Sequence, residues 1–273
     1  MKLQSRVLLL YFIIALLVLV LIGGVLPSSL HKQNLNTVSG HYIDQLQHID
    51  FAISNFISSV KYDVHELATN EDVRARDDAE FTSFLNASED SFFYTIGPQE
   101  QEIVNILKGY QLTHPYVDSV YMGRENGAFI RAFPRARPTA YDPRTRPWYI
   151  LAMSNPGEIM VTEPYQAVTT PDVNIGIVTT LLDERGDPYG VVGADITLVS
   201  LTNYISRFDV GDDAEMILAD KNGMILASRN SSLLFGDIRS ILGEQTEPFL
   251  TVNEGVIVLN DRYLIHYTSP ELG

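Results

Sequence analysis

An uncharged apolar block near the N-terminus constrains this chain more than any other feature. Residues 7–30 contain no charged side chain, and this run exceeds the roughly 20 residues that an α-helix needs to cross a hydrocarbon core of about 30 Å. Lys2 and Arg6 precede the block, and no acidic residue occurs before Asp44. Because basic flanks stay on the cytoplasmic side of a membrane, we expect residues 1–6 in the cytoplasm and the chain after residue 30 outside it.

A cleaved signal peptide is the alternative interpretation of this block, since such peptides also combine a basic start with an apolar run. The run here is longer than the roughly 7 to 15 residues of a signal-peptide core, and no Ala-x-Ala-like cleavage site follows it. The sequence therefore favours a single uncleaved anchor in a bacterial inner membrane.

The composition restricts the classes of protein that the exported part can belong to. The chain has 273 residues, no cysteine, and 34 acidic against 19 basic residues, for a net charge of −15. The absence of cysteine excludes a disulfide framework, a zinc–cysteine site and a thiol nucleophile, and the negative charge argues against nucleic-acid binding. An acidic, cysteine-free domain fits a bacterial periplasm or outer surface, and its own core must stabilise it.

A long amphipathic helix is predicted to follow the anchor, over residues 34–69. Apolar residues recur there at spacings of three and four, the pattern of one buried helix face. A helix of this length would extend about 54 Å at 1.5 Å per residue and would form a spine. It can be a simple core helix, or a second face can also form a homodimer seam. The main stripe consists of Leu46, Ile49, Ile53, Phe56, Val60, Val64 and Leu67, and the second face of Ile43, Phe51 and Ile57.

The next part of the chain changes from helical to strand patterning. Short helices are predicted over residues 77–85 and 99–107, the second opened by Pro98. Antiparallel strands after helices indicate an α+β domain. The turn sequences Asn126-Gly127 and 184–187 predict two hairpins, because Gly and Asn tolerate positive φ. The predicted strands are 117–121, 128–133, 158–163, 174–182 and 189–196.

A weak internal repeat suggests a second module. Residues 121–132 resemble residues 217–228, since in each a strand enters a charged Asn-Gly turn and an apolar strand returns. A helix over 198–208 would join the two modules. The last predicted strand, 263–267, leaves the second sheet short, and we expect the chain to be a fragment or a truncated form of a longer receptor.

Signatures of catalysis are missing from the sequence. There is no G-x-S-x-G elbow and no phosphate-binding glycine loop. His65-Glu66 begins a zinc-protease pattern, but position 69 is Thr rather than His, and the six histidines form no ligand pair. We therefore expect no catalytic residues, no metal and no cofactor, and a membrane-tethered hydrolase is the weakest alternative.

A basic island interrupts the acidic chain shortly before its only tryptophan, Trp148. Arginine forks bind carboxylates with two hydrogen bonds, and aromatic walls strengthen that binding by excluding water. The island therefore predicts a site for a small organic anion. In the alternative interpretation, the arginines pair with nearby acids on a solvated loop, and Trp148 is a core anchor. The six arginines are Arg124, Arg131, Arg135, Arg137, Arg144 and Arg146.

Three motifs in order carry a family resemblance. The segments 141–149 (YDPRTRPWY), 162–165 (TEPY) and 190–196 (GVVGADI) resemble the double Cache sensor domains of bacterial chemoreceptors, sensor histidine kinases and diguanylate cyclases. The resemblance runs from the apolar block to about residue 268. It implies an α+β fold in which two PAS-like antiparallel modules share one spine helix. The implied parts are a cytoplasmic N-terminus (1–6), a transmembrane helix (7–30), the spine (31–74), a membrane-distal ligand-binding module (75–197), and a linker helix with an incomplete membrane-proximal module (198–273).

The resemblance also implies a set of ligand contacts in the distal module. One position departs from the family pattern: an acidic residue is expected two places after Tyr165, and Ala167 stands there. Losing that carboxylate should weaken an amino-acid ligand by about 1.5 to 3 kcal/mol, unless Asp172 substitutes or the ligand carries less positive charge. Asp195 has a structural alternative as the cap of the following helix. The implied contacts are Tyr121, Arg146, Trp148 and Tyr149 around the ligand carboxylate, and Tyr165 and Asp195 at its ammonium group.

The sequence thus predicts a sensor region rather than an enzyme. The expected ligand is a small metabolite, preferably an amino acid or an amine, and the expected partners are the membrane and a second copy of the chain through the spine helix. Two alternatives remain: a docking platform for a periplasmic solute-binding protein, and an organic-acid sensor without amino-acid specificity.

Overall fold

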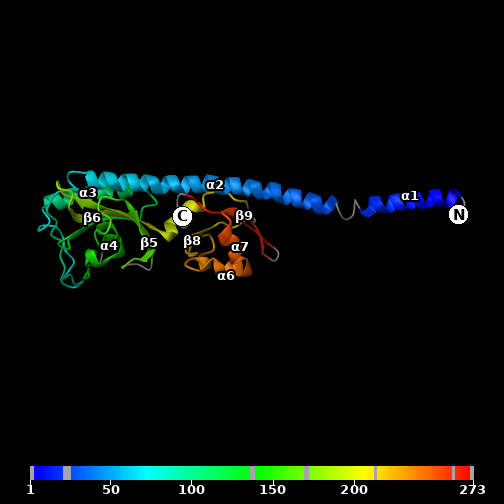
Figure 1. The fold of residues 1–273 in the computed structure, drawn as a ribbon. Coiled ribbons are helices and arrows are strands. Elements are labelled where there is room, and N and C mark those ends of the chain that lie inside the picture. The colour runs from blue at the N-terminus through cyan, green and yellow to red at the C-terminus, as the bar shows by residue number, and fades with distance from the viewer. Residues whose placement is uncertain are drawn as a thin grey trace. The chain divides into compact units, whose positions relative to one another are not determined.

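The structure is a computed structural model that describes residues 3–20, 26–135, 139–168, 172–211, 214–259 and 262–270. Its contacts divide the chain into two compact units, one combining Met1–Asp50 with Arg239–Gly273 and the other comprising Phe51–Ile238. The α+β class with antiparallel sheets and one long helix is confirmed (Figure 1).

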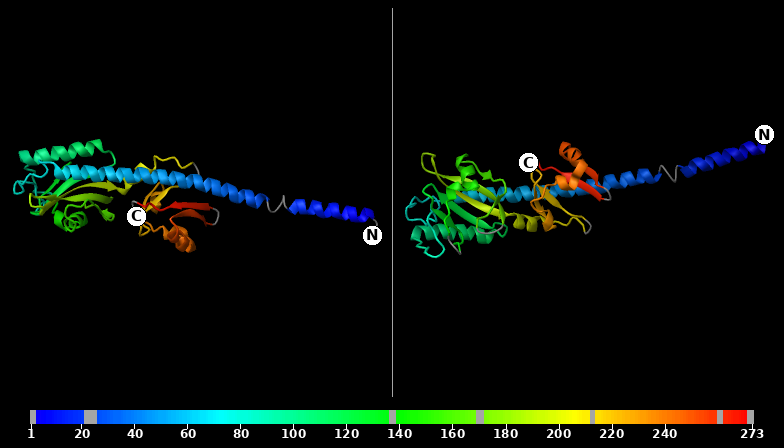
Figure 2. Two further views of the ribbon diagram at one scale, coloured as in Figure 1. Left: turned by 45° about the horizontal axis from the view of Figure 1, so that its top comes forward. Right: turned by 90° about the horizontal axis from the view of Figure 1, so that it is seen from below.

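The larger unit, Phe51–Ile238, contains the main antiparallel sheet, with the strand order β2-β1-β6-β5-β3 and β4 paired to β5. The helix α3 and the end of α2 cover one face of this sheet, and α4 covers the other (Figure 2). The elements are α3 (Pro98–Thr113), β1 (Ser119–Arg124), β2 (Phe129–Arg131), α4 (Pro147–Met153), β3 (Met160–Val161), β4 (Tyr165–Gln166), β5 (Val173–Leu182), β6 (Pro188–Thr197), α5 (Leu198–Ile205), β7 (Ile217–Ala219) and β8 (Ile225–Ser228), with short 3₁₀ turns at Pro143–Thr145 and Ser231–Leu233.

The smaller unit contains the N-terminal helices and the last hairpin. Among the described residues, no helix combines the length and the apolar character needed to cross a membrane. Residues 21–25 of the predicted span lie outside the described residues. The elements here are α1 (Leu3–Val20), the start of α2 (Leu26–Thr69), α6 (Arg239–Leu242), a 3₁₀ turn (Gly243–Gln245), α7 (Thr246–Thr251), β9 (Glu254–Leu259) and β10 (Arg262–Tyr267).

The predicted spine helix is confirmed by α2, which begins earlier than expected, at Leu26. Ile49, Ile53, Val60, Val64 and Leu67 of the predicted stripe are buried. Phe51, assigned to the second face, is 68% exposed. The spacing of apolar residues therefore identified which face of the helix meets the core.

Both predicted hairpins of the distal sheet are confirmed. The strands β1 and β2 pair around Asn126-Gly127, where Gly127 has a φ of 87° that side chains with a Cβ rarely adopt. The strands β5 and β6 pair around residues 183–187. The repeat is also visible locally, because β7 and β8 pair across an Asn-Gly turn of their own. Over the described residues, β7–β8 and β9–β10 are separate two-stranded sheets.

The helix predicted over residues 77–85 is wrong. The segment consists of turns and one isolated bridge between Ser83 and Ala128. Its backbone groups have partners elsewhere: the Thr82 N–H donates to the Glu100 carboxylate (2.9 Å), and the Thr82 carbonyl accepts from the Phe129 N–H (2.9 Å). Because the sheet edge and α3 already satisfy these groups, a helical turn would have to break contacts of equal value.

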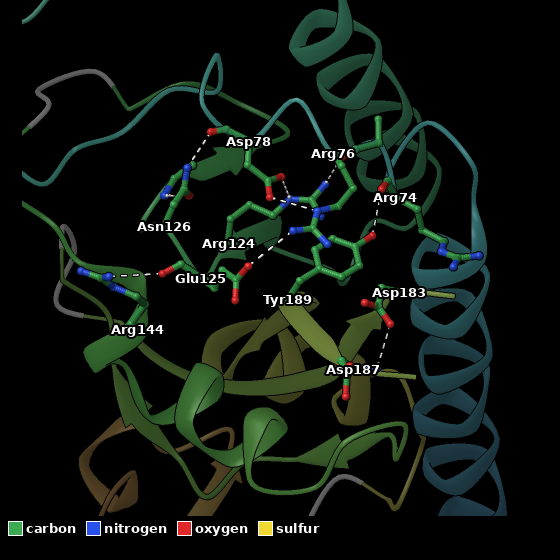
Figure 3. Close-up of polar contacts among 12 residues, drawn as sticks. Arg74, Arg76, Asp78, Arg124, Glu125, Asn126, Arg144, Asp183, Asp187 and Tyr189 are labelled. Atoms are coloured by element: carbon green, nitrogen blue, oxygen red, sulfur yellow. Dashed lines mark hydrogen bonds and ion pairs between the residues drawn. The ribbon is translucent and has the colours of Figure 1, made fainter. Parts of the chain in front are cut away.

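Arg124, at the end of β1, anchors the segment that follows α2 (Figure 3). Its side chain is 0% exposed, and one guanidinium nitrogen donates to the carbonyls of Val73 (2.7 Å) and Ala75 (2.9 Å). Nε lies 3.5 Å from Asp78 Oδ1. The Tyr189 hydroxyl holds the intervening carbonyl, of Arg74, at 2.9 Å. The side chains of Arg124 and Tyr189 therefore hold the carbonyl groups of residues 73–75, which follow α2.

The arrangement predicts that Arg124→Met destabilises the protein by about 3 kcal/mol or more, because the carbonyls of Val73 and Ala75 lose their donor and Asp78 keeps only the more exposed Arg76 as a cation. The measurement is the free energy of unfolding in urea, on the full chain in detergent. The matched control is Arg144→Met, since Arg144 pairs with Asp142 (2.8 Å) on the exposed surface, where such pairs contribute less than about 1 kcal/mol. Equal losses in the two variants would contradict the anchoring role.

Candidate ligand-binding site

Asp195 is the centre of the candidate site. It lies on β6, between Ser119 of β1 and Gly176 of β5, and is 5% exposed. Its Oδ1 accepts hydrogen bonds from the hydroxyls of Tyr121 (2.6 Å) and Tyr165 (2.7 Å). Its Oδ2 accepts one from the Asn174 amide nitrogen (2.8 Å). Asp195 therefore has a full set of donors, all of them neutral.

Burial raises the pKa of Asp195 to about 6, because removal from water disfavours the charged form more than the hydrogen bonds from Tyr121, Tyr165 and Asn174 favour it. The pKa values of Tyr121 and Tyr165 are raised by burial and by the charge of Asp195, so both phenols stay protonated donors. No Lys, Arg or His among the described residues forms an ion pair with Asp195. The charge of Arg131 favours the ionised form of Asp195 from beyond ion-pair distance, so the site holds a buried carboxylate without a cation in direct contact.

Gly176, on the neighbouring strand β5, leaves space for the Asp195 carboxylate. A Cβ at this position would meet Asp195 Oδ1 at 3.2 Å and the Tyr121 hydroxyl at 3.4 Å. A side chain there would crowd the atoms that the carboxylate needs. The Thr162 hydroxyl, which accepts from the Gly176 N–H (2.8 Å), holds this strand in place.

An aromatic cluster packs against the face of the sheet that carries Asp195. Trp148 and Tyr149 are buried on α4, a helix that begins with Pro147 at its first position, and Trp148 lies 4.7 Å from the Tyr121 ring. Tyr141 lies 4.7 Å from Phe129. The cluster excludes water from the carboxylate and provides an apolar wall of the kind that lines small-molecule sites.

Arg146 occupies the N-cap position of α4 and is half-buried. Its guanidinium donates to the Gln166 carbonyl of β4 (3.0 Å). Burial raises the pKa of Tyr141, and a hydrogen bond from Trp148 and the charge of Arg146 oppose this shift, while the charge of Asp195 adds to it. Tyr141 therefore lies within reach of both the proposed carboxylate-binding and ammonium-binding groups.

The structure brings together all but one of the predicted contacts. Asp172 is the exception: its backbone carbonyl accepts from the Ala167 N–H (2.9 Å), but its carboxylate makes no hydrogen bond to the cluster in the part of the chain that the structure describes. Asp172 thus lies opposite Ala167, the position at which the family pattern has an acidic residue. The helix-capping alternative for Asp195 is wrong, because the cap of α5 is Thr197, whose hydroxyl accepts from the Ser200 N–H.

Asn174 was not predicted from the sequence, and Arg131 was predicted only as a member of the basic island, not among the contacts that the resemblance implies. The predicted hairpins could have placed both residues beside the site. The turn at 184–187 pairs Asn174 with Thr197, two residues from Asp195, and the turn at Asn126-Gly127 pairs Arg131 with Tyr121.

The basic island is divided by the structure. Arg144 pairs with Asp142 on the surface, as the structural alternative predicts, whereas Arg124 is buried and lies beside Asp78, which that alternative does not predict. Arg131, Arg135 and Arg146 have no such pair among the described residues, and Arg137 lies outside them. Among these residues, no three His, Asp or Glu side chains are placed to hold a metal ion.

Comparison with known proteins identifies the distal sheet. Residues 105–203 match the model of the first PDC sensor domain of methyl-accepting chemotaxis protein-like proteins. The chain is 35% identical over 131 residues to the methyl-accepting chemotaxis protein McpB of Bacillus subtilis, covering 48% of this chain and 19% of McpB. It is 36% identical over 122 residues to McpA of Pseudomonas putida, covering 44% and 19%. The chain therefore spans about a fifth of the length of these relatives.

Solved structures show the same fold. The ligand-binding domain of the Pseudomonas fluorescens chemoreceptor CtaA, in complex with L-isoleucine, matches with a TM-score of 0.63 at 21% identity, over 86% of each chain. The ligand-binding domain of the Pseudomonas aeruginosa amino acid chemoreceptor PctC, in complex with GABA, matches with a TM-score of 0.61 at 21% identity, over 82% of this chain and 89% of that one. Residues 105–203 thus match a chemoreceptor-type sensor domain, and the chain shares the fold of chemoreceptor ligand-binding domains.

Proposed function

We propose that this chain is the membrane-anchored, extracytoplasmic part of a sensor that binds a small metabolite with both an ammonium and a carboxylate group. Amino acids are the preferred class. The ligand ammonium would meet Asp195, Tyr121 and Tyr165, and the ligand carboxylate would meet Arg146, with Trp148 and Tyr149 as the apolar wall.

The observation that carries this proposal is the buried carboxylate of Asp195, which has no cation in direct contact. A carboxylate that loses water is costly unless a positive charge compensates it, and the chain supplies only neutral donors within hydrogen-bond distance. An ammonium group provides that charge together with three donors. The chemoreceptor domains of CtaA and PctC support the proposal, because both were solved with molecules that combine an amine and a carboxylate.

The proposal also accounts for the single missing acid. With Ala167 in place of a second carboxylate, the pocket can compensate one ammonium group but offers little to a diamine. A zwitterion therefore fits the described residues better than a polyamine does.

The test is a thermal-shift screen of amino acids, amines and organic acids against the full chain in detergent. We expect amino acids to raise the melting temperature, and Arg146→Ala and Asp195→Asn each to weaken that effect by about tenfold or more in ligand concentration. The control is Arg144→Ala, which lies on the same loop but is paired with Asp142.

Other outcomes of the same screen separate the alternatives. Stabilisation by organic acids that lack an amine, unaffected by Asp195→Asn, would favour an organic-acid sensor. Stabilisation by a periplasmic solute-binding protein, with no response to any metabolite, would favour a docking platform. Either result contradicts the proposed function.

Amino-acid binding should depend on pH through Asp195. Its pKa of about 6 means that the carboxyl group becomes neutral below that pH and then no longer attracts an ammonium ion. We expect the dissociation constant to be constant above about pH 7 and to rise by up to about tenfold per pH unit below pH 6. Isothermal titration calorimetry from pH 4.5 to 8 measures this, and Asp195→Asn should give a flatter profile. A profile for the parent chain that is flat through pH 6 would contradict the proposed role.

Membrane anchoring through residues 7–30 is part of the proposal. It rests on the uncharged apolar sequence and its basic N-terminal flank. We expect the full chain to stay in the membrane fraction after carbonate extraction, and a chain that begins at residue 33 to be released. Recovery of the full chain in the soluble fraction would contradict the anchor.

A further inference from the structure

Three arginines near the candidate site have no acidic partner among the described residues: Arg131, Arg135 and Arg146. The chain contains 34 acidic residues and only 19 basic ones, so most cations have acids to choose from. Arg76, Arg124 and Arg144 do form ion pairs. Arg135 and Arg146 also lie close to the aromatic cluster, through contacts with Tyr141 and through α4, so the three are candidates for binding an anionic group of a ligand.

Arg131 lies on the same face of the sheet as Tyr121 and Asp195. It is the direct cross-strand partner of Tyr121, and side chains of such pairs share one face. Its guanidinium donates to the Ser119 hydroxyl (3.1 Å), and Ser119 is in turn the cross-strand partner of Asp195. The charge of Arg131 lowers the pKa values of Asp195 and Tyr141 against the effect of burial. Arg131 therefore lies beside the proposed ammonium-binding group.

Arg135 is the second cation in this region and is 6% exposed. Its guanidinium lies over the rings of Phe84 (5.4 Å) and Tyr141 (5.2 Å). Its only hydrogen bonds among the described residues go to the carbonyl and hydroxyl oxygens of Thr139, both at 3.2 Å. A buried guanidinium that contacts only neutral groups attracts an anion strongly, because little water screens it.

A small hollow of about 20 Å³ lies between these two arginines, α3 and the segment before it. Tyr94 and Phe84 form part of its wall. Glu100 also lines it; one of its oxygens accepts from the Thr82 N–H, and burial raises its pKa. The lining therefore contains two arginines against one acidic residue, and Arg135 also contacts the Tyr141 ring.

We propose that Arg131 and Arg135 form a subsite for a second carboxylate, so that the site selects amino acids with an acidic side chain over their neutral amides. This inference rests on the proposed function, in which Asp195 and Arg146 hold the ammonium and the first carboxylate. In this arrangement the ligand ammonium meets Asp195, its first carboxylate meets Arg146, and its second carboxylate meets Arg131 and Arg135. A ligand with a neutral side chain brings no anionic group to Arg131 and Arg135.

The experiment measures the affinities of L-glutamate, L-glutamine, L-aspartate and L-asparagine for the full chain in detergent by calorimetry. Each acid and its amide have nearly the same shape, so their ratio isolates the charge. We expect one acid to bind about tenfold or more tightly than its amide, and Arg131→Gln to reduce this ratio to near one by weakening the acid alone. Arg131→Lys should retain part of the preference, and the exposed, paired Arg144→Gln should leave both affinities unchanged.

The possible failures are distinguishable. If neither acid binds more tightly than its amide, the subsite is wrong while the proposed function stands, and this result needs no variant that must fold. If Arg131→Gln weakens acid and amide equally, Arg131 only supports the fold and the subsite is again wrong. If none of the four binds and no other amino acid raises the melting temperature, the proposed function itself fails.

Discussion

The buried carboxylate of Asp195 is the constraint on which the rest of the ligand-binding unit depends. Three neutral donors hold it, yet burial still raises its pKa to about 6, so the ionised group is only partly compensated by the protein. The neighbouring choices follow from this. Gly176 leaves space for its oxygens, Asn174 fills its second acceptor position, and the aromatic cluster keeps water away. A cationic group of a ligand would therefore interact with Asp195 more strongly here than in water.

The same two strands carry the candidate site and the anchor of the spine. Tyr121 and Arg124 both lie on β1, and Asp195 and Tyr189 both lie on β6. Arg124 and Tyr189 hold the carbonyls of residues 73–75, directly after α2. A shift of β1 against β6 on ligand binding would therefore move a segment fixed to the end of the spine helix. Such a shift transmits a signal only if the ligand binds the two arrangements with different affinity.

Periodicity predicted the elements well where a single face is buried, and poorly where tertiary contacts replace local ones. The spacing of apolar residues identified the long helix, and two Asn/Gly turns identified the hairpins. The local sequence of residues 77–85 resembles a helix, but their backbone forms hydrogen bonds to the Glu100 carboxylate and to the edge of β2. Local patterning cannot predict such tertiary contacts. The density of arginines predicted an anion site, but it did not distinguish the arginines that pair with acids, such as Arg144, from those that do not, such as Arg135. Strand alternation would have separated Arg124 from Tyr121, since an odd spacing puts them on opposite faces of β1.

The net charge of the residues that line this site depends on positions far apart in the sequence. Ala167 stands where the family pattern has an acid on the ammonium side, and Arg131 is a cation on the strand paired with Tyr121. Under the proposed subsite, both residues favour a ligand with more negative charge. A buried charge in a binding site strongly rejects a ligand that lacks the opposite charge, because the protein group then stays both desolvated and unpaired. An apolar pocket discriminates much less strongly against one extra methylene group. Selectivity between an acid and its amide can therefore be large even though the two ligands have nearly the same volume.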